Sequence, residues 1–238
     1  MTSGRLGPVR ITAMAGLAAA AVAVGVASTG CSVVKKFDKI RHTVANNRAT
    51  IKAFTDGLKN SSAAPFRATY VTAGSSPTTV TYAIQPPKNS SFTETGAGTS
   101  TTKLISNSSG QYSCSRTSAG ARWSCEKLGT ASALAQRQLF SIYTPDHWVT
   151  FLHVIAFGAG LAGDKVTTSS KTVNGFAMHC VDLFVKKEGT STICTTKQNI
   201  LGYVKVASQS TTFQIKSYTS SPPAWVFRLP SGAKITKQ

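Results

Sequence analysis

The feature that most constrains this chain is a series of short segments in which apolar and polar residues alternate. FRATYVT places Phe66 and Tyr70 on one side of a strand, and TTVTYAI does the same for Val80, Tyr82 and Ile84. Clusters of Gly, Ser, Pro and Asn separate such segments at 74–77, 86–89, 96–98 and 107–110. Strands of this length with turn signals at this spacing predict an antiparallel meander.

Strand-like segments return after residue 165 and end before Pro222 and Pro223. Asn174-Gly175 is a tight hairpin signal. In the strand that follows, GFAMHCVDLFVK, apolar residues occupy both faces: Phe176, Met178 and Phe184 on one, Val181, Leu183 and Val185 on the other. An antiparallel strand with two apolar faces predicts that other elements cover both of its sides.

Two regions carry the period of a helix instead. The first covers about residues 43 to 59, where Val44, Ile51, Phe54 and Leu58 recur at helical spacing. The second covers 130 to 161, where one helix is expected in SALAQRQLFSIY and another after Thr144-Pro145-Asp146. This last helix is apolar nearly all round, which is typical of a helix buried on several sides.

Four of the five cysteines form an even set, and the intervals between them predict two hairpins. Cys114 and Cys125 flank a Gly-containing turn, and Cys180 and Cys194 bracket the turn around Gly189. Of the three possible connectivities, the two local bridges are the most natural, since each closes a short loop. Each would stabilise the fold by roughly 3 kcal/mol. No CxxC or Cys/His spacing suggests zinc, and we expect no metal and no diffusible cofactor.

The amino terminus has the pattern of an export signal. Arg5 and Arg10 precede an apolar run from about Ile11 to Ala27, followed by Ser28-Thr29-Gly30-Cys31. The last stretch resembles a bacterial lipobox, with Ser28 where the strict motif has leucine. We therefore expect residues 1–30 to be a lipoprotein signal peptide, Cys31 to carry diacylglycerol and an acyl group such as palmitate, and 31–42 to be a basic tether. The alternative is that Cys31 ends an uncleaved anchor.

The chain is strongly basic, with 26 Lys and Arg against 8 Asp and Glu and a formal charge of +18. Removal of residues 1–30 leaves about +16, spread along the whole length. Export and the lack of a concentrated basic motif argue against nucleic acid as a partner. Attraction to anionic lipid, wall polymer or glycolipid head groups fits this charge better. The tether lysines are equally compatible with a simple solvated linker.

The order of these elements resembles that of the LolA-like half-barrel lipoproteins of mycobacteria and related actinobacteria, the LprG and LppX type. The stretches that carry the resemblance are QYSCSRTSAGARWSC, GFAMHCVDLFV, STICTTKQNILGYVKV and the ending TTFQIKSYTSSPPAWVFRLPSGAKI. Across residues 43–238 it implies an α+β fold: a single strongly curved antiparallel β-sheet whose concave face is covered by helices. It also implies an apolar cavity that holds the acyl chains of lipids or glycolipids.

An acyl-chain pocket requires apolar lining and a polar mouth, and no catalytic group. The side chains expected to line it combine the two middle helices with the neighbouring strands. They are Tyr70, Tyr82, Leu139, Trp148, Phe151, Leu152, Ile155 and Met178. The competing interpretation is that these residues fill an ordinary core.

We do not expect an enzyme. The chain has no Gly-x-Ser-x-Gly elbow, its Ser-x-x-Lys matches lack the partner motifs of penicillin-recognising enzymes, and its eight carboxylates are scattered. His179 alternates with apolar neighbours, as a structural strand residue does. Asn-x-Ser sequons at Asn60, Asn89 and Asn107 follow from the Ser richness of the chain.

The sequence therefore predicts a monomeric lipoprotein, anchored on the extracytoplasmic face of the cell membrane, that carries or presents a lipid at the cell envelope. An envelope transport partner is compatible with this role. The alternative is a lipid-anchored module that binds or senses a protein and has a filled core.

Overall fold

A computed structural model describes residues 30–56, 64–74, 77–96, 98, 100–141, 150, 152–153, 159–160, 162, 164–185, 189–207 and 210–237. The chain divides between Lys36 and Phe37, and the description below concerns Phe37–Gln238, apart from the bounds of the first helix.

Two α-helices and one 3-10 helix accompany twelve strands in the described part of the chain. The helices are α1 (Gly30–Asp56), α2 (Thr130–Ser141) and η2 (Ala224–Phe227). The first six strands are β1 (Phe66–Ala73), β2 (Thr79–Gln85), β3 (Asn89–Thr95), β4 (Thr101–Asn107), β5 (Gly110–Arg116) and β6 (Ser124–Lys127). The others are β7 (Lys165–Val173), β8 (Phe176–Val185), β9 (Gly189–Thr196), β10 (Leu201–Lys205), β11 (Thr212–Thr219) and β12 (Lys234–Lys237).

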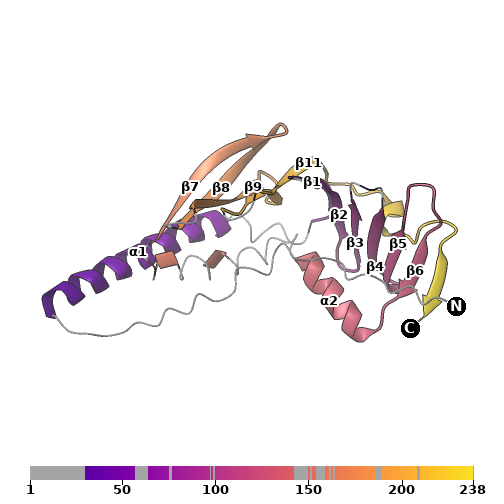
Figure 1. Cartoon of the computed structure of the whole chain (residues 1–238), viewed down its shortest axis with the longest axis horizontal. Coiled ribbons are helices and arrows are strands. Elements are labelled where there is room, and N and C mark those ends of the chain that lie inside the picture. Colours follow the sequence, from indigo (N-terminus) through magenta and orange to yellow (C-terminus); the bar gives the residue numbers. More distant parts are fainter. Residues whose placement is uncertain are drawn as a thin grey trace. The chain divides into compact units, whose positions relative to one another are not determined.

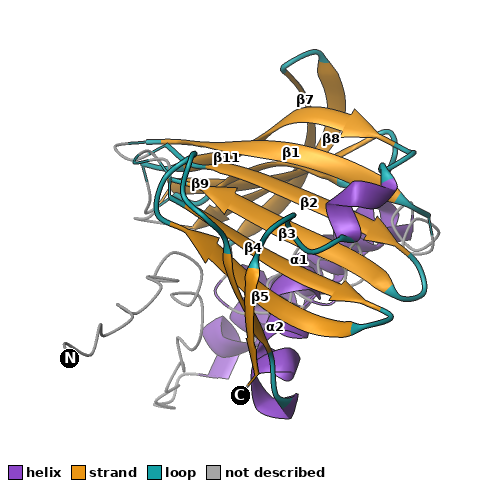
Figure 2. Ribbon diagram, turned by 90° about the vertical axis from the view of Figure 1, so that its right-hand side faces the viewer, coloured by secondary structure: helices purple, strands orange, loops and turns teal. Residues whose placement is uncertain are grey.

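All twelve strands form one sheet in the order β12-β6-β5-β4-β3-β2-β1-β11-β10-β9-β8-β7. The sheet is curved and does not close, since β12 and β7 are its two edges (Figure 2). Neighbouring strands are antiparallel with one exception, because β12 pairs with β6 in parallel. The fold class is therefore the expected α+β half-barrel. The expectation that every strand pair is antiparallel was wrong only for β12, which is parallel to β6.

The strand register separates the side chains into two faces. The inner face carries Tyr82, which lies opposite Ala68 in β1 and Phe92 in β3. Both α-helices lie on this side of the sheet (Figures 1 and 2). The outer face is the opposite one and carries, for example, Ala83 and Ile105.

Helix α1 is fixed to the inner face at the β7 side of the sheet. Ile51 is fully buried in a cluster with Val166 of β7 and Val181 of β8. Asn47 is 2% exposed, and its side-chain amide donates to the Asp164 carbonyl and accepts from the Val166 amide. Because a buried backbone group without a partner costs about 1–3 kcal/mol, one asparagine holds the start of β7 against the helix.

The C-terminal segment, residues 220–233, covers part of the outer face. Val226 and Phe227 of η2 are buried against Ala83 of β2. Two side chains of β4 hold its backbone, since Lys103 donates to the Arg228 carbonyl and Asn107 donates to the Phe227 carbonyl. The sequence predicts only a turn here, because these contacts join residues 125 and 120 positions apart.

At the other end of the sheet, residues at the tip of the β7–β8 hairpin cover the outer face. Its tip bends toward β11, where the Asn174 side chain donates to the Ile215 carbonyl at 2.7 Å. Asn174 and Gly175 have positive φ angles of 51° and 81°, which confirms the predicted tight turn. Met178 is buried and lies directly against Gly202 of β10.

Both expected hairpin disulfides are present. Cys114 pairs with Cys125 across β5 and β6, and Cys180 with Cys194 across β8 and β9. All four sulfurs belong to the outer face and all four residues are fully buried. Disulfides of this kind are typical of an oxidising, extracytoplasmic compartment.

Helix α1 begins earlier than the sequence predicts. The expected start is near residue 43, but helical backbone extends from Gly30 through the proposed tether. The physical reason is that residues 31–42 contain neither proline nor glycine, so nothing in this segment breaks a helix, and its lysines and arginine are good helix formers.

Candidate functional site

The largest apolar group on the inner face is an aromatic cluster, which we define as Phe66, Tyr70, Tyr82, Phe92 and Phe213. All five are at most 9% exposed. The rings of Tyr70 and Phe213 stack with centroids 4.6 Å apart, and Phe66 meets Tyr82 edge-on at 5.6 Å. Four adjacent strands, β11, β1, β2 and β3, supply the members. The cluster is therefore a continuous aromatic band across the middle of the sheet.

Burial of Tyr82 raises the pKa of its phenol well above the usual value. Removal from water penalises the phenolate, so the hydroxyl stays neutral under physiological conditions. Tyr82 therefore contributes an apolar ring with an uncharged polar end.

The inner face becomes polar on one side of the aromatic cluster. Along one row of the register, Phe92 is followed by Leu104 in β4, Ser113 in β5 and Glu126 in β6. Leu104 is partly buried and packs against the cluster, whereas Glu126 is the first charge in the row. An apolar band bordered by polar groups is the arrangement that an amphiphile requires.

A second apolar cluster lies on the inner face beside α1. It contains Leu152 and Ala159 together with Ile51, Val166 and Val181. Ile193 of β9 packs against both this cluster and the larger core cluster to which the aromatic residues belong, and it lies opposite Val204 of β10. The two clusters thus form one apolar surface over the inner face, from β3 to β7.

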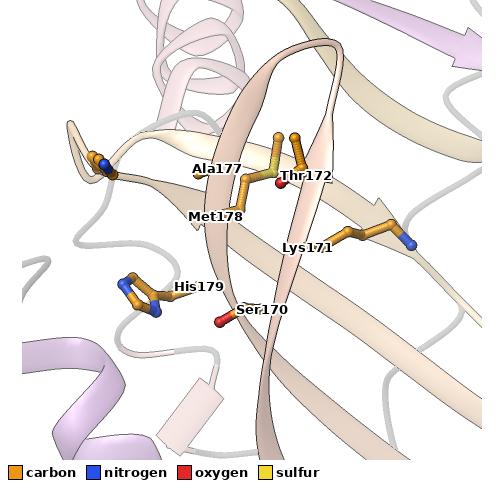
Figure 3. A pocket seen from close by; sticks show the side chains of 7 residues that line it. Ser170, Lys171, Thr172, Ala177, Met178 and His179 are labelled. Atoms are coloured by element: carbon orange, nitrogen blue, oxygen red, sulfur yellow. The ribbon is translucent and has the colours of Figure 1, made fainter.

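A separate hollow of about 260 Å³ lies at the β7–β8 hairpin (Figure 3). It is lined by Ser170, Lys171, Thr172, Ala177, Met178, His179 and Lys197. His179 and Lys171 point to opposite sides of the hairpin (Figure 3). Ligand pockets usually have about 300–1,000 Å³ and a mostly apolar lining. This hollow is smaller and more polar, so it is a poor candidate for an acyl-chain site.

The described residues offer little catalytic chemistry. Among them, no group of three or more His, Cys, Asp or Glu is arranged to hold a metal ion. Asp182 accepts hydrogen bonds from Ser169 and Thr192 of the neighbouring strands, which gives this carboxylate a structural role. His179 is exposed on β8.

The structure locates some of the predicted lining residues and not others. Tyr70 and Tyr82 lie in the aromatic cluster, and Leu152 lies in the second apolar cluster. Trp148, Phe151 and Ile155 lie outside the described residues. Leu139 belongs to α2 and Cys31 to α1, but their side chains are also outside the description.

Among the predicted lining residues whose side chains the structure describes, Met178 is the one that lies on the other face of the sheet. It lies opposite Thr196 on the outer face, whereas Tyr70 and Tyr82 belong to the inner face. The correction follows from the composition of β8, which is apolar on both faces, so that the sequence does not tell which face points inward. Phe66, Phe92 and Phe213 were not among the predicted lining residues. Phe92 is the one large apolar residue of β3, and Phe213 alternates with Ile215 in β11.

No family model matches the chain, and no curated protein matches it. Solved structures are similar at low identity. The crystal structure of MucB shares 12% identity with a TM-score of 0.46, over 77% of this chain and 64% of MucB. An uncharacterized conserved protein from Thermus thermophilus shares 5% with a TM-score of 0.44, over 79% and 98% of the two chains. MucB in complex with MucA(peri) shares 9% with a TM-score of 0.37, over 78% and 62%.

The chain thus spans 64% of the length of the MucB chain that it matches. Similarity at this level says nothing about a ligand or partner of the present chain. The curved, unclosed sheet with helices on its inner face is a half-barrel, as the strand order shows by itself. Within the described residues, no helix combines the length and the apolar character that a membrane span needs.

Proposed function

We propose that this protein is a membrane-tethered extracytoplasmic carrier that binds the acyl chains of a lipid or glycolipid on the inner face of its half-barrel. It would move or present this ligand at the cell envelope, and it would do so without catalysis. Cys31 would carry the acyl anchor, as its lipobox-like context suggests.

The observation that carries the proposal is the continuous apolar surface of the inner face. The aromatic cluster and the second apolar cluster extend over consecutive strands of the sheet, from β3 to β7, and a polar border lies beside them on β5 and β6. Each buried CH₂ of an acyl chain contributes about 0.8 kcal/mol. Burial of the ligand's acyl chain between this surface and the helices would therefore be enough to drive binding, and no charged side chain would be needed for it.

The experiment uses two neighbouring residues of β4 that face opposite ways. Leu104 is on the inner face and partly buried at the border of the aromatic cluster, whereas Ile105 is fully buried on the outer face. Wild-type protein, Leu104→Asn and Ile105→Asn are extracted from native membranes, and the lipid that co-purifies is measured by mass spectrometry. Thermal unfolding is recorded on the same samples.

We expect Leu104→Asn to lose lipid several-fold with little change in stability. Ile105→Asn should lower the free energy of unfolding by about 2–5 kcal/mol, while the protein that remains folded keeps its lipid. Wild-type protein without lipid, or lipid loss in strict proportion to stability in both variants, would refute the carrier.

The anchor is tested separately. Cys31→Ala should abolish labelling by radioactive fatty acid, because no other residue is expected to accept the acyl chain, and the protein should then leave the membrane in high salt. Labelling that persists in this variant would end the lipoprotein proposal and leave ligand binding untouched.

One observation favours the alternative of a protein-binding or sensor module. Tyr70 is fully buried and Tyr82 is 1% exposed, and the close ring contacts of the aromatic cluster are those of a filled core. Under this alternative, purified wild-type protein carries no lipid, and cross-linking in the native envelope captures a protein at the inner-face border. The mass spectrometry above therefore distinguishes the two functions.

A further inference from the structure

The register sorts the charged side chains of the sheet by face. In the half formed by β1 to β6, Arg67, Arg116 and Lys127 belong to the outer face, whereas Glu94 and Glu126 belong to the inner face. Adjacent residues of a strand point to opposite faces, so this separation is a property of the sequence in its observed register. The outer face of these strands has no acidic residue among those described.

The C-terminal segment adds positive charge to the same outer face. Residues 220–237 contain no Asp or Glu, and Arg228 is exposed. Arg122, in the loop before β6, is also exposed and donates to the Gly232 carbonyl. The cations of this region have carbonyls and rings as partners, because no carboxylate of the described residues lies on the outer face of β1 to β6.

Arg67, Arg116 and Lys127 each lie over an aromatic ring. Arg67 is 5.6 Å from the Trp225 ring centre, Arg116 is 4.8 Å from that of Trp123, and Lys127 is 6.0 Å from that of Tyr112. Cation–π contacts of this kind hold a charge at the surface without neutralising it.

Large apolar side chains are exposed beside these cations. Trp225, on η2, is 61% exposed, and Ile235, opposite Cys125 in the register, is 52% exposed. Cations together with an exposed Trp are typical of surfaces that bind at the interface of an anionic bilayer, where the ring enters the head-group region and the charges meet phosphate.

We propose that this surface, which we call the outer-face patch (Arg67, Arg116, Arg122, Lys127, Trp225, Arg228 and Ile235), docks on the anionic surface of a phospholipid bilayer. Docking would orient the half-barrel on the membrane. It requires neither the anchor nor a ligand on the inner face. The net charge of +18 on the chain favours the approach, since long-range attraction concentrates a cation near an anionic surface.

The other half of the sheet provides a matched control. Its outer face carries Lys165 and Lys205, which are both exposed, but it also carries Asp182. Lys127→Glu/Arg228→Glu and Lys165→Glu/Lys205→Glu therefore change the net charge of the chain equally, at exposed positions in different halves.

The experiment measures sedimentation of the full chain with vesicles of phosphatidylcholine, alone or with about one third phosphatidylglycerol. All proteins carry Cys31→Ala, so no acyl chain contributes. At about 1 kcal/mol per basic residue near an anionic surface, we expect the patch variant to bind the anionic vesicles at least about tenfold more weakly. The control variant should lose less than about threefold, and Trp225→Ser should weaken binding at unchanged charge.

Circular dichroism and unfolding of each variant show that the fold is retained. Lipid loading measured by mass spectrometry should be the same in both double variants, which separates docking from the proposed carrier function. Equal losses in the two double variants, equal binding to the two vesicle types, or unchanged binding of Trp225→Ser would each overturn the proposal. Tighter binding of soluble polyglutamate than of anionic vesicles would also overturn it and point to a polymeric partner.

Discussion

The two ends of the sheet have similar disulfides, but different segments of the chain cover them. Each end has a hairpin closed by a disulfide on the outer face, Cys114–Cys125 at one end and Cys180–Cys194 at the other. The first is covered by the C-terminal segment, through Leu229 and Ala233. The second shares an apolar cluster with Val173 and Phe176, at the tip of the β7–β8 hairpin.

The two covers are attached to the outer face by different sets of contacts. The C-terminal segment is attached by the buried side chains of Val226 and Phe227 and by two hydrogen bonds, which Lys103 and Asn107 donate to its carbonyls. The hairpin is attached by apolar contacts and one hydrogen bond, from Asn174 to Ile215. In both cases the cover packs on the outer face of the sheet, opposite the face that carries the helices.

The largest expected effect comes from removing the disulfides one at a time. Replacing Cys114 and Cys125 with Ala, or Cys180 and Cys194 with Ala, should each lower the free energy of unfolding by about 3 kcal/mol, because the loops closed are of similar length. Denaturant unfolding of the two double variants measures this. A loss at one end more than twice that at the other would show that the covers, and not the loops, set the stability of the ends.

A smaller loss is expected where α1 packs against Gly160. A Cβ atom at Gly160 would lie 2.7 Å from the Cα of Val44 in α1, so Gly160→Ala requires the backbone to move. We expect a loss of about 1–3 kcal/mol. Gly202→Ala is the control, because its Cβ would meet the flexible end of Met178 on the outer face. If Gly202→Ala proves the more damaging by thermal unfolding, the outer face is the more tightly packed one.

The C-terminal segment gives the next prediction. Asn107 donates to the Phe227 carbonyl at 2.9 Å and accepts from the Ser109 amide, so Asn107→Ala should cost about 1–2 kcal/mol. Arg228→Ala is the matched control. Its carbonyl holds the contact with Lys103, and its exposed side chain is not needed for it. Proteolysis of the C-terminal segment should accelerate in Asn107→Ala alone; equal rates would mean that the apolar contacts of η2 suffice.

The local parts of this structure were predictable from sequence. Alternation in residues 79–85 and the Asn174-Gly175 turn depend on neighbours along the chain, and both are where the pattern places them. The parallel pairing of Lys234–Lys237 with β6 joins segments that are far apart in the sequence and has no local signal. Met178 shows the same limit at the candidate site, because a strand that is apolar on both faces has the same pattern in either orientation.

The smallest expected effect concerns Lys103, which is 9% exposed on the outer face beneath the C-terminal segment. Burial lowers the pKa of its ammonium below the usual value of 10.5. Between the lowered folded pKa and 10.5, the unfolded chain therefore binds more protons than the folded one, and stability rises with pH. Lys103→Met removes this slope. At neutral pH the variant should be within about 1 kcal/mol of wild type, since an apolar replacement of similar shape removes the buried charge together with its hydrogen bond.

Paired unfolding curves from about pH 7 up to the usual lysine pKa of 10.5 measure the difference. Wild type should gain on Lys103→Met as the pH rises, because the penalty for the buried charge disappears when the amine loses its proton. A difference that is constant with pH would mean that Lys103 is solvated in solution. The C-terminal segment would then be less tightly closed over β4 than the contact with the Arg228 carbonyl indicates, and the two ends of the sheet would differ in strength as well as in kind.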